Sequence, residues 1–246
     1  MGITSHGSDM LEEDGVVGLF AAYTLERPQT ADDDVEIFTE EVSNILEDSN
    51  RSEEVLVDTY LLSGLTPGVD YLVRIHAHDL TTAQEVLREF QATSFGRYSK
   101  LVDVLIGIIR DAVYLPQTPD LDAIEKAATF EGTEPPDYAI IIPVDKNAEW
   151  WNLPDSDRIE KMRDHIEVAL PYLDRIRRQL YHSSGLTDYD YITYFETNDL
   201  SAFIDLYRDL ESIPEYHYVS DGNPTLIGRI ESSETIVDKL LQSEDI

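Results

Sequence analysis

Residues 145–183 read DKNAEWWNLPDSDRIEKMRDHIEVALPYLDRIRRQLYHS, and this stretch predicts a helix followed by a strand. Pro154 and Asp155 mark the start of the helix, with Asp155 as the expected N-cap, and Pro171 ends it. Residues 175–183 and 189–196 are expected to form two strands on either side of the turn SSGLTD.

The predicted helix places a histidine beside its apolar stripe. Met162, His165, Ile166 and Ala169 share one face at spacings of three and four residues. Two interpretations of His165 follow from this position. It is either a core histidine bonded to a backbone carbonyl or an axial ligand of haem iron, because imidazole is a common protein ligand for that metal.

The predicted strand places an arginine among aliphatic side chains. Ile176, Arg178 and Leu180 share one face, and burying a guanidinium without a partner is costly. Arg178 therefore either pairs with one of the many carboxylates or waits for an anionic ligand in an apolar cavity.

The segment that precedes the predicted helix contains three further candidate residues for a haem site. Trp150 and Trp151 are the only tryptophans, and they suit either ordinary core packing or contact with a flat macrocycle. Lys146 is either a solvated lysine or a partner for a carboxylate of such a macrocycle.

Beyond residues 145–183, the two halves of the chain are expected to have the same order of strands and helices. The expected strands are 16–25, 55–62, 71–78, 101–114, 138–144, 175–183, 189–196, 216–219 and 225–230; the expected helices are 35–46, 81–90, 155–170, 200–210 and a terminal helix from 233. Residues 101–114 fit a helix nearly as well, and residues 1–15 are expected to be loose. Each half thus runs strand, helix, strand, strand, helix, strand, the ferredoxin-like βαββαβ order. We predict an α+β fold in which two such repeats form one dimeric α+β barrel.

The Pro-rich and acidic run at 115–137 indicates a connector between the halves. We therefore divide the chain into an N-terminal half at 1–114, the connector, and a C-terminal half at 138–246. The candidate ligands fall in the C-terminal half, so the haem site is expected there and not in the N-terminal half.

Composition excludes several classes of function. The chain has 246 residues and a formal net charge of −32, spread along its length, which argues against binding nucleic acid or anionic membranes. With no cysteine there are no disulfides or thiolate sites.

No apolar run reaches the length of a membrane span, and the start lacks a secretory pattern, so a cytoplasmic location is expected, although an exported form stays open. Such acidity is typical of proteins from salt-loving organisms, because molar salt screens the repulsion.

Residues 138–230 resemble the chlorite dismutase family. The strings that carry the resemblance are IPVDKNAEWW, MRDH, LPYLDRIRRQLYHSSGL, YITYFET and GNPTLIG, with FGRY at 95–98 in the N-terminal half. The resemblance implies that His165 ligates the iron of haem b and that Glu215 accepts a hydrogen bond from its far nitrogen. It also implies that Arg178 is the distal arginine acting on substrate, and that Lys146, Trp150 and Trp151 contact the haem, Lys146 on the propionate side.

The branch of this superfamily that decarboxylates coprohaem has a tyrosine and a glutamine where this chain has Ile142 and Arg178. Both residues favour the chlorite-degrading branch, with Ile142 expected in the cofactor site. That branch converts chlorite to chloride and dioxygen, forming the O–O bond through a ferryl intermediate and retained hypochlorite. The resemblance also implies a homo-oligomer, with a homopentamer favoured. Three alternatives remain open: the coprohaem branch, a non-enzymatic haem carrier, and an α+β barrel that binds no haem.

Overall fold

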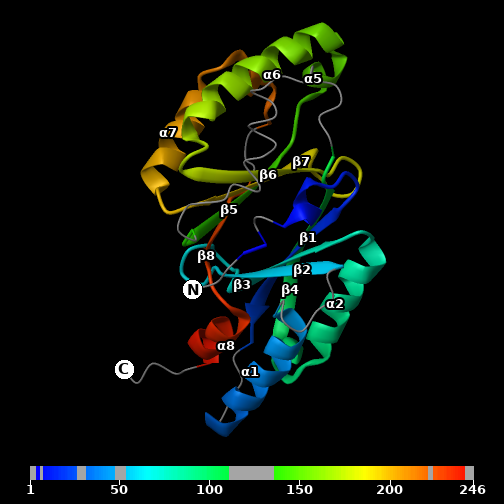
Figure 1. The fold of residues 1–246 in the computed structure, drawn as a ribbon, viewed down its shortest axis with the longest axis vertical. Coiled ribbons are helices and arrows are strands. Elements are labelled where there is room, and N and C mark those ends of the chain that lie inside the picture. The colour runs from blue at the N-terminus through cyan, green and yellow to red at the C-terminus, as the bar shows by residue number, and fades with distance from the viewer. Residues whose placement is uncertain are drawn as a thin grey trace. The chain divides into compact units, whose positions relative to one another are not determined.

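The computed structural model describes residues 4–5, 8–26, 32–47, 54–110, 136–220 and 224–241 (Figure 1). By their internal contacts, residues 1–5, 16–106 and 226–246 form one compact unit, unit 1, and residues 6–15 and 107–225 form a second, unit 2. The predicted connector at 115–137 falls almost entirely outside the described ranges. The division into 1–114, 115–137 and 138–246 therefore stays a prediction.

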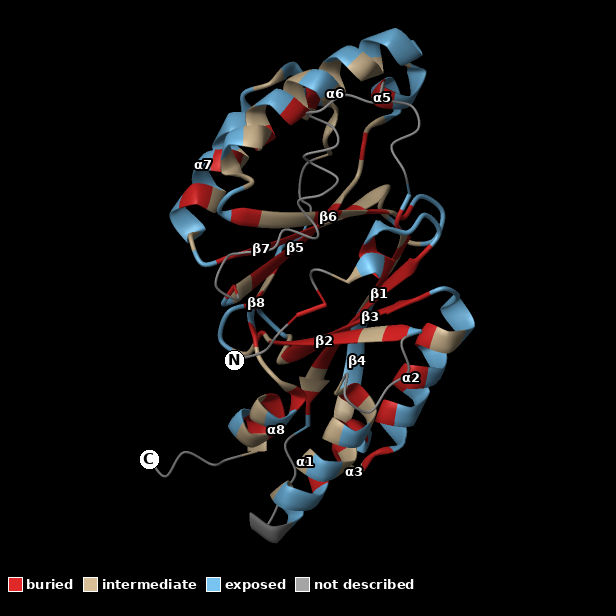
Figure 2. Ribbon diagram, in the orientation of Figure 1, coloured by how far each residue is buried: buried red, intermediate tan, exposed pale blue. Residues whose placement is uncertain are grey.

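Unit 1 is built on an antiparallel sheet with strand order β1-β3-β2-β8. Its strands are β1 (Val17–Leu25), β2 (Val55–Leu61), β3 (Tyr71–Ala77), β8 (Leu226–Ile230) and most of β4 (Ser99–Ile108). The central strand β3 is buried along its whole length, which is expected for a strand paired on both edges and covered by helices (Figure 2).

The described part of unit 1 contains four helices: α1 (Asp32–Leu46), α2 (Leu80–Ala92), α3 (Ser94–Arg97) and α8 (Ser233–Leu241). Three aromatic side chains form part of the hydrophobic core of this unit. The rings of Tyr23 and Tyr71 stack at 5.2 Å between centroids, and Phe90 meets both edge-on. These offset and T-shaped contacts stabilise the core beyond the area that they bury.

Unit 2 is built on the antiparallel strand order β5-β7-β6, with β5 at Tyr138–Val144, β6 at Ile176–His182 and β7 at Tyr191–Thr197. The end of β4 joins this sheet through the pair Ile108 and His182. Within its described residues, the helices are α5 (Ala148–Asn152), α6 (Asp155–Ala169) and α7 (Leu200–Glu211), and the 3-10 turns are η1 (Asp9–Glu12), η3 (Leu170–Tyr172) and η4 (Pro214–Tyr218). The α+β class and the order of elements in each half are confirmed, and residues 99–108 form a strand rather than a helix.

Two local predictions in unit 2 are wrong. Residues 216–219 do not form a strand: Pro214 opens the 3-10 turn η4, and only Val219 makes a bridge, to Lys146. Asp155 does not cap α6, because it is the first helical residue and Pro154 occupies the N-cap position. The Asp155 carboxylate accepts a hydrogen bond from Arg158 at 2.5 Å instead.

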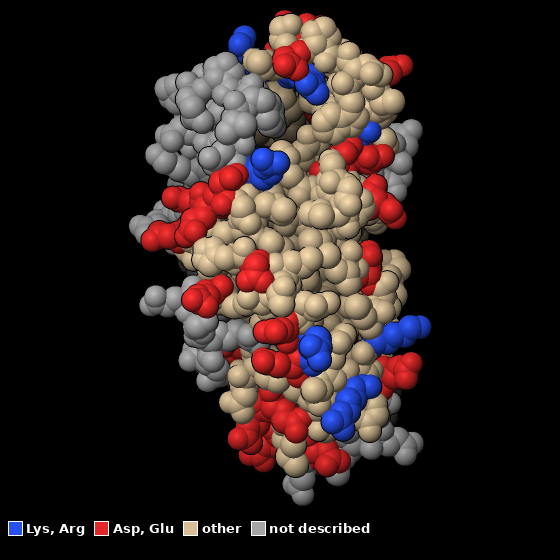
Figure 3. Space-filling model, turned by 90° about the vertical axis from the view of Figure 1, so that its right-hand side faces the viewer, with Lys and Arg blue, Asp and Glu red and all other residues tan. Residues whose placement is uncertain are grey.

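The surface carries the negative charge that the composition predicts. Figure 3 shows Asp and Glu side chains scattered over the face drawn, with Lys and Arg at few places. None of the helices in the described ranges combines the length and apolarity needed to cross a membrane.

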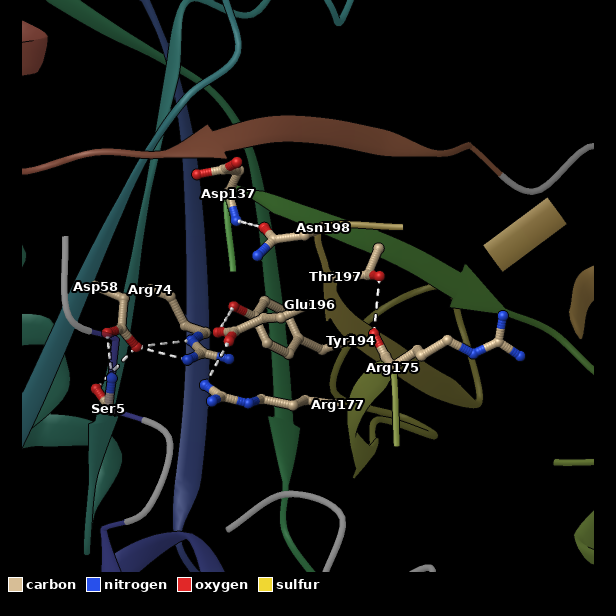
Figure 4. Close-up of polar contacts among 10 residues, drawn as sticks. All are labelled: Ser5, Asp58, Arg74, Asp137, Arg175, Arg177, Tyr194, Glu196, Thr197 and Asn198. Atoms are coloured by element: carbon tan, nitrogen blue, oxygen red, sulfur yellow. Dashed lines mark hydrogen bonds and ion pairs between the residues drawn. The ribbon is translucent and has the colours of Figure 1, made fainter. Parts of the chain in front are cut away.

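The expectation that residues 1–15 are loose is wrong for the part that is described. Ser5 is buried, and both its backbone N–H and its hydroxyl donate to the carboxylate of Asp58, at 2.6 and 2.8 Å (Figure 4). Arg74, which is fully buried, donates to the same carboxylate from Nε and Nη2. The Asp58 charge is thus satisfied inside unit 1 by a segment 53 residues away in sequence.

Candidate functional site: a haem-sized cavity in unit 2

Unit 2 encloses a cavity of about 400 Å³ between its sheet and its helices. All seven residues singled out from the sequence line it: Ile142, Lys146, Trp150, Trp151, His165, Arg178 and Glu215. They come from six different elements and connections, so the fold brings together side chains up to 73 positions apart. Most of the remaining lining is apolar or aromatic, and the volume is in the range of known cofactor sites.

The strand and the helix present the side chains that their periodicities predict. Ile176, Arg178 and Leu180 line the cavity from alternate positions of β6, while Tyr181 on the opposite face is fully buried. On α6, Met162, His165 and Ala169 line the cavity from one helical face.

Glu215 links His165 to Lys146. One carboxylate oxygen, Oε2, lies 3.5 Å from Nδ1 of His165, at the long end of hydrogen-bond distances, and the other, Oε1, forms an ion pair with Nζ of Lys146. Backbone contacts set this arrangement: Asn147 N–H donates to the carbonyl of Tyr218 at 2.9 Å, and Ser220 N–H donates to that of Asp145 at 2.8 Å. They hold η4, and with it Glu215, against the segment that follows β5.

The environment keeps the His165 imidazole neutral. Burial lowers its pKa from 6.5 to about 3, and the positive charges of Arg178 and Lys146 act in the same direction. A neutral imidazole has a nitrogen lone pair available for a metal. Because Nδ1 faces Glu215, Nε2 is the ring nitrogen left for that role.

Lys146 is not the solvated lysine that one of the two interpretations predicted. Its ammonium group is nearly buried, pairs with Glu215 and lies 4.8 Å from the centre of the Trp150 ring. Burial lowers its pKa to about 8, against the opposing charge of Asp190. The structure thus places Lys146 beside the carboxylate that contacts His165; its contact with a propionate stays a prediction.

The two tryptophans face different ways. Trp150 is 4% exposed and packs against Tyr218 with ring centroids 5.6 Å apart. Trp151 is 45% exposed and stacks on Tyr191 at 6.5 Å. Both line the cavity, Trp150 from its interior and Trp151 from a part that reaches solvent.

Several lining residues were missed in the sequence. Tyr172, Tyr207 and Tyr216 come from η3, α7 and η4, and nothing in the local pattern links three tyrosines on separate elements. Arg158 could have been found, because it lies seven residues before His165 on the same helical face.

The donor set fits a metal carried by a macrocycle. Among the described residues no cluster of three or more His, Cys, Asp or Glu side chains could hold a bare metal ion. A single neutral imidazole in an apolar cavity, backed by a carboxylate and accompanied by arginines, is suited to haem iron, whose other in-plane ligands come from the porphyrin.

Comparisons with known proteins agree with this geometry. The family model described as chlorite dismutase matches residues 35–231. A chlorite dismutase of Ideonella dechloratans is 45% identical over 204 residues, covering 82% of this chain and 70% of that protein. A coproheme decarboxylase of Mycolicibacterium smegmatis is 25% identical over 223 residues, covering 90% and 93% of the two chains. A solved chlorite dismutase of Candidatus Nitrospira defluvii in complex with imidazole superimposes with a TM-score of 0.86 at 35% identity, covering 95% and 98%. The chain therefore belongs to the chlorite dismutase family.

Proposed function

We propose that this chain is a haem b enzyme that converts chlorite to chloride and dioxygen. The observation that carries the proposal is the presence of His165 and Arg178 in one apolar cavity, close enough for the arginine charge to lower the histidine pKa. One group is suited to ligate iron and the other to hold an anion.

His165 would ligate the iron of a bound haem through Nε2. Glu215 accepts a hydrogen bond from the Nδ1 side, which orients the ring and makes it a stronger electron donor. Lys146 balances the Glu215 charge, so the carboxylate is stabilised in a cavity where an unpaired charge would be costly. The bound haem supplies the redox chemistry.

Arg178 binds the anionic substrate and keeps the hypochlorite product of the first oxygen transfer inside the cavity. Arg178 lines the cavity together with apolar residues, including Leu180 and Phe195. In such a low-dielectric environment a charge-assisted hydrogen bond to an oxyanion is stronger than in water. Retention allows the second oxygen atom to be used before hypochlorite escapes.

An oxygen electrode tests this function directly. Protein purified with haem is mixed with chlorite, and we expect one dioxygen and one chloride for each chlorite consumed. Haem binding without oxygen release would favour a non-enzymatic carrier, and loss of carboxyl groups from added coprohaem would favour the decarboxylase branch. Either result would overturn the proposal.

We also propose a homo-oligomer, with five copies favoured by the family resemblance, and a cytoplasmic enzyme adapted to high salt. A solution mass near five times the 28.0 kDa chain mass, measured by analytical ultracentrifugation in molar salt, is the expected result. A monomer under those conditions would contradict it.

A further inference from the structure

Among the described residues that line the cavity, three side chains are cationic: Lys146, Arg158 and Arg178. The ammonium group of Lys146 is already paired with Glu215 and lies over the ring of Trp150. Arg178 occupies the middle of β6 and has the proposed substrate role. The proposed reaction therefore assigns a role to Lys146 and to Arg178, but none to Arg158.

Arg158 lies toward one end of the cavity, not at its centre. Arg158, Met162 and His165 are spaced by four and three residues on one face of α6, and all three line the cavity. At 1.5 Å per residue, Arg158 is displaced along the helix from His165 by about 10 Å. A macrocycle whose iron is held at His165 would present an edge, rather than its centre, to a side chain at this distance.

The far end of α6 carries two cavity-lining tyrosines whose hydroxyls contact carboxylates outside the cavity lining. There the Tyr172 hydroxyl donates to Asp209 at 2.5 Å, and the Tyr216 hydroxyl lies 3.5 Å from Glu211. Leu206 and Leu210 complete that end with apolar surface. Of the cavity-lining Lys and Arg side chains among the described residues, none comes from η3, α7 or η4, and the apolar surface there suits the hydrocarbon edge of a ligand.

The present partner of Arg158 competes only weakly. Asp155 accepts a hydrogen bond from Nη2 at 2.5 Å, but its side chain is 87% exposed, whereas that of Arg158 is 27% exposed. Exposed ion pairs contribute little free energy, and a guanidinium has further N–H groups that can bind a second carboxylate.

We propose that Arg158 binds a haem propionate and thereby sets the orientation of the macrocycle, with its carboxylate edge toward the start of α6 and its hydrocarbon edge toward η3 and α7. This inference rests on the proposed function for the identity of the ligand. It assigns to Arg158 the role that the sequence suggested for Lys146.

The test measures haem release and does not depend on turnover. Wild type, Arg158→Gln and Arg163→Gln are each loaded either with haem b or with its dimethyl ester, in which both propionates are uncharged. Release to an excess of an apo-globin is followed by the Soret band. Arg163 is the matched control, since it is an exposed arginine of the same helix that does not line the cavity.

We expect Arg158→Gln to release haem b about tenfold faster than wild type, as for loss of one charge-assisted hydrogen bond. It should release the dimethyl ester at the wild-type rate, and Arg163→Gln should match wild type with both ligands. Wild-type release of haem b by Arg158→Gln would overturn the inference, as would equal acceleration with both ligands, which would indicate a packing role.

The two proposals can fail separately. If wild type holds haem and Arg158→Gln behaves as expected, yet chlorite yields no oxygen, the proposed reaction fails and the assignment of Arg158 stands. If wild type holds no haem, both are overturned.

Discussion

At the scale of single residues, Glu215 connects the proposed iron ligand, His165, to a buried cation, Lys146. Its two oxygens contact different partners, His165 and Lys146, and the carboxylate is only 5% exposed. A buried carboxylate in contact with the far nitrogen of an imidazole increases electron donation to a metal on the near nitrogen. The redox properties of bound iron should therefore respond to this side chain.

Replacing Glu215 by Gln removes that charge. We expect the ferric/ferrous midpoint potential to rise, because the ferric state loses electron donation, and activity to fall about tenfold to a hundredfold. Spectroelectrochemistry measures the potential. Glu149→Gln, an exposed glutamate in α5, is the control. A potential equal to or below that of wild type would contradict the role given to Glu215.

Replacing Arg178 by Ala should lower turnover by about a hundredfold, as does removal of a donor to a reacting oxyanion. It should also reduce the total number of turnovers before the haem bleaches, because hypochlorite escapes. Arg178→Lys keeps the charge without the planar fork and should give intermediate values for both quantities. If Arg178→Ala completes as many turnovers before inactivation as wild type, retention by this residue is refuted.

The lowered pKa of His165 predicts a flat pH profile for haem binding. A histidine with a pKa of 6.5 would lose affinity about tenfold between pH 7 and pH 5.5, because the protonated ring cannot ligate iron. With a pKa of about 3, His165 remains neutral throughout this range, and the histidine-dependent part of the affinity should not change. Fluorescence quenching of Trp150 and Trp151 by added haem measures the dissociation constant. A decline centred near pH 6.5 that is absent in His165→Ala would count against the neutral ligand.

At the scale of elements, α7 helps to close the cavity with Leu206, Tyr207 and Leu210. Its first turn is capped by Asp199, whose carboxylate accepts a hydrogen bond from the N–H of Ala202 at 2.9 Å. The stability of this helix should therefore depend on the cap.

Asp199→Ala should destabilise the fold by about 1 kcal/mol, the usual effect of losing such a cap. For a chain of this size, the midpoint of thermal unfolding should fall by about 2–4 °C. Asp199→Asn retains a capping oxygen and should lie close to wild type. Calorimetry gives the midpoints, and equal values for Asp199→Ala and wild type would show that the cap contributes little.

Sequence patterns predicted the elements whose buried face can be read from the local spacing of their apolar residues. The faces of β6 and α6 were predicted because apolar residues recur at periods of two and 3.6, and these faces position Arg178 and His165. The cap of α7 is also a local feature, since Asp199 has a capping residue type and directly precedes the helix.

The wrong predictions concern two kinds of residue. Some have partners that are distant in the sequence, and others have a residue type suited to one local role but occupy a different one. Ser5 is ordered by Asp58, a contact that no local pattern contains. Asp155 has a capping residue type, but it lies within the helix and binds Arg158. The 3-10 turn at 214–218 depends on Pro214 and on backbone bonds to the segment after β5. The pairing of Lys146 with Glu215 joins positions 69 residues apart, and neither the local pattern nor the resemblance predicted it.

At the scale of the whole molecule, the net charge of −32 opposes both the compact state and the approach of an anionic substrate. Screening shortens the range of both effects, since the Debye length falls from about 10 Å at 0.1 M salt to about 3 Å at 1 M. Stability and substrate capture should therefore improve together as salt is raised.

We expect the Michaelis constant for chlorite to fall steadily as potassium chloride is raised from 0.1 M to above 1 M, with a smaller change in kcat. Potassium sulfate at matched ionic strength separates screening from competition by chloride. A Michaelis constant that does not vary over this range would show that the surface charge has no part in substrate capture.

The most direct test of the central claim, that Arg178 retains an oxyanion next to iron held by His165, follows the oxygen atoms. Chlorite labelled with ¹⁸O is given to the haem-loaded protein in unlabelled water, and the evolved gas is analysed by mass spectrometry. We expect almost all dioxygen at mass 36, because both atoms come from chlorite without exchange, and a reduced share of that mass from Arg178→Ala. Dioxygen containing oxygen from water in the wild type, or no dioxygen at all, would contradict the claim.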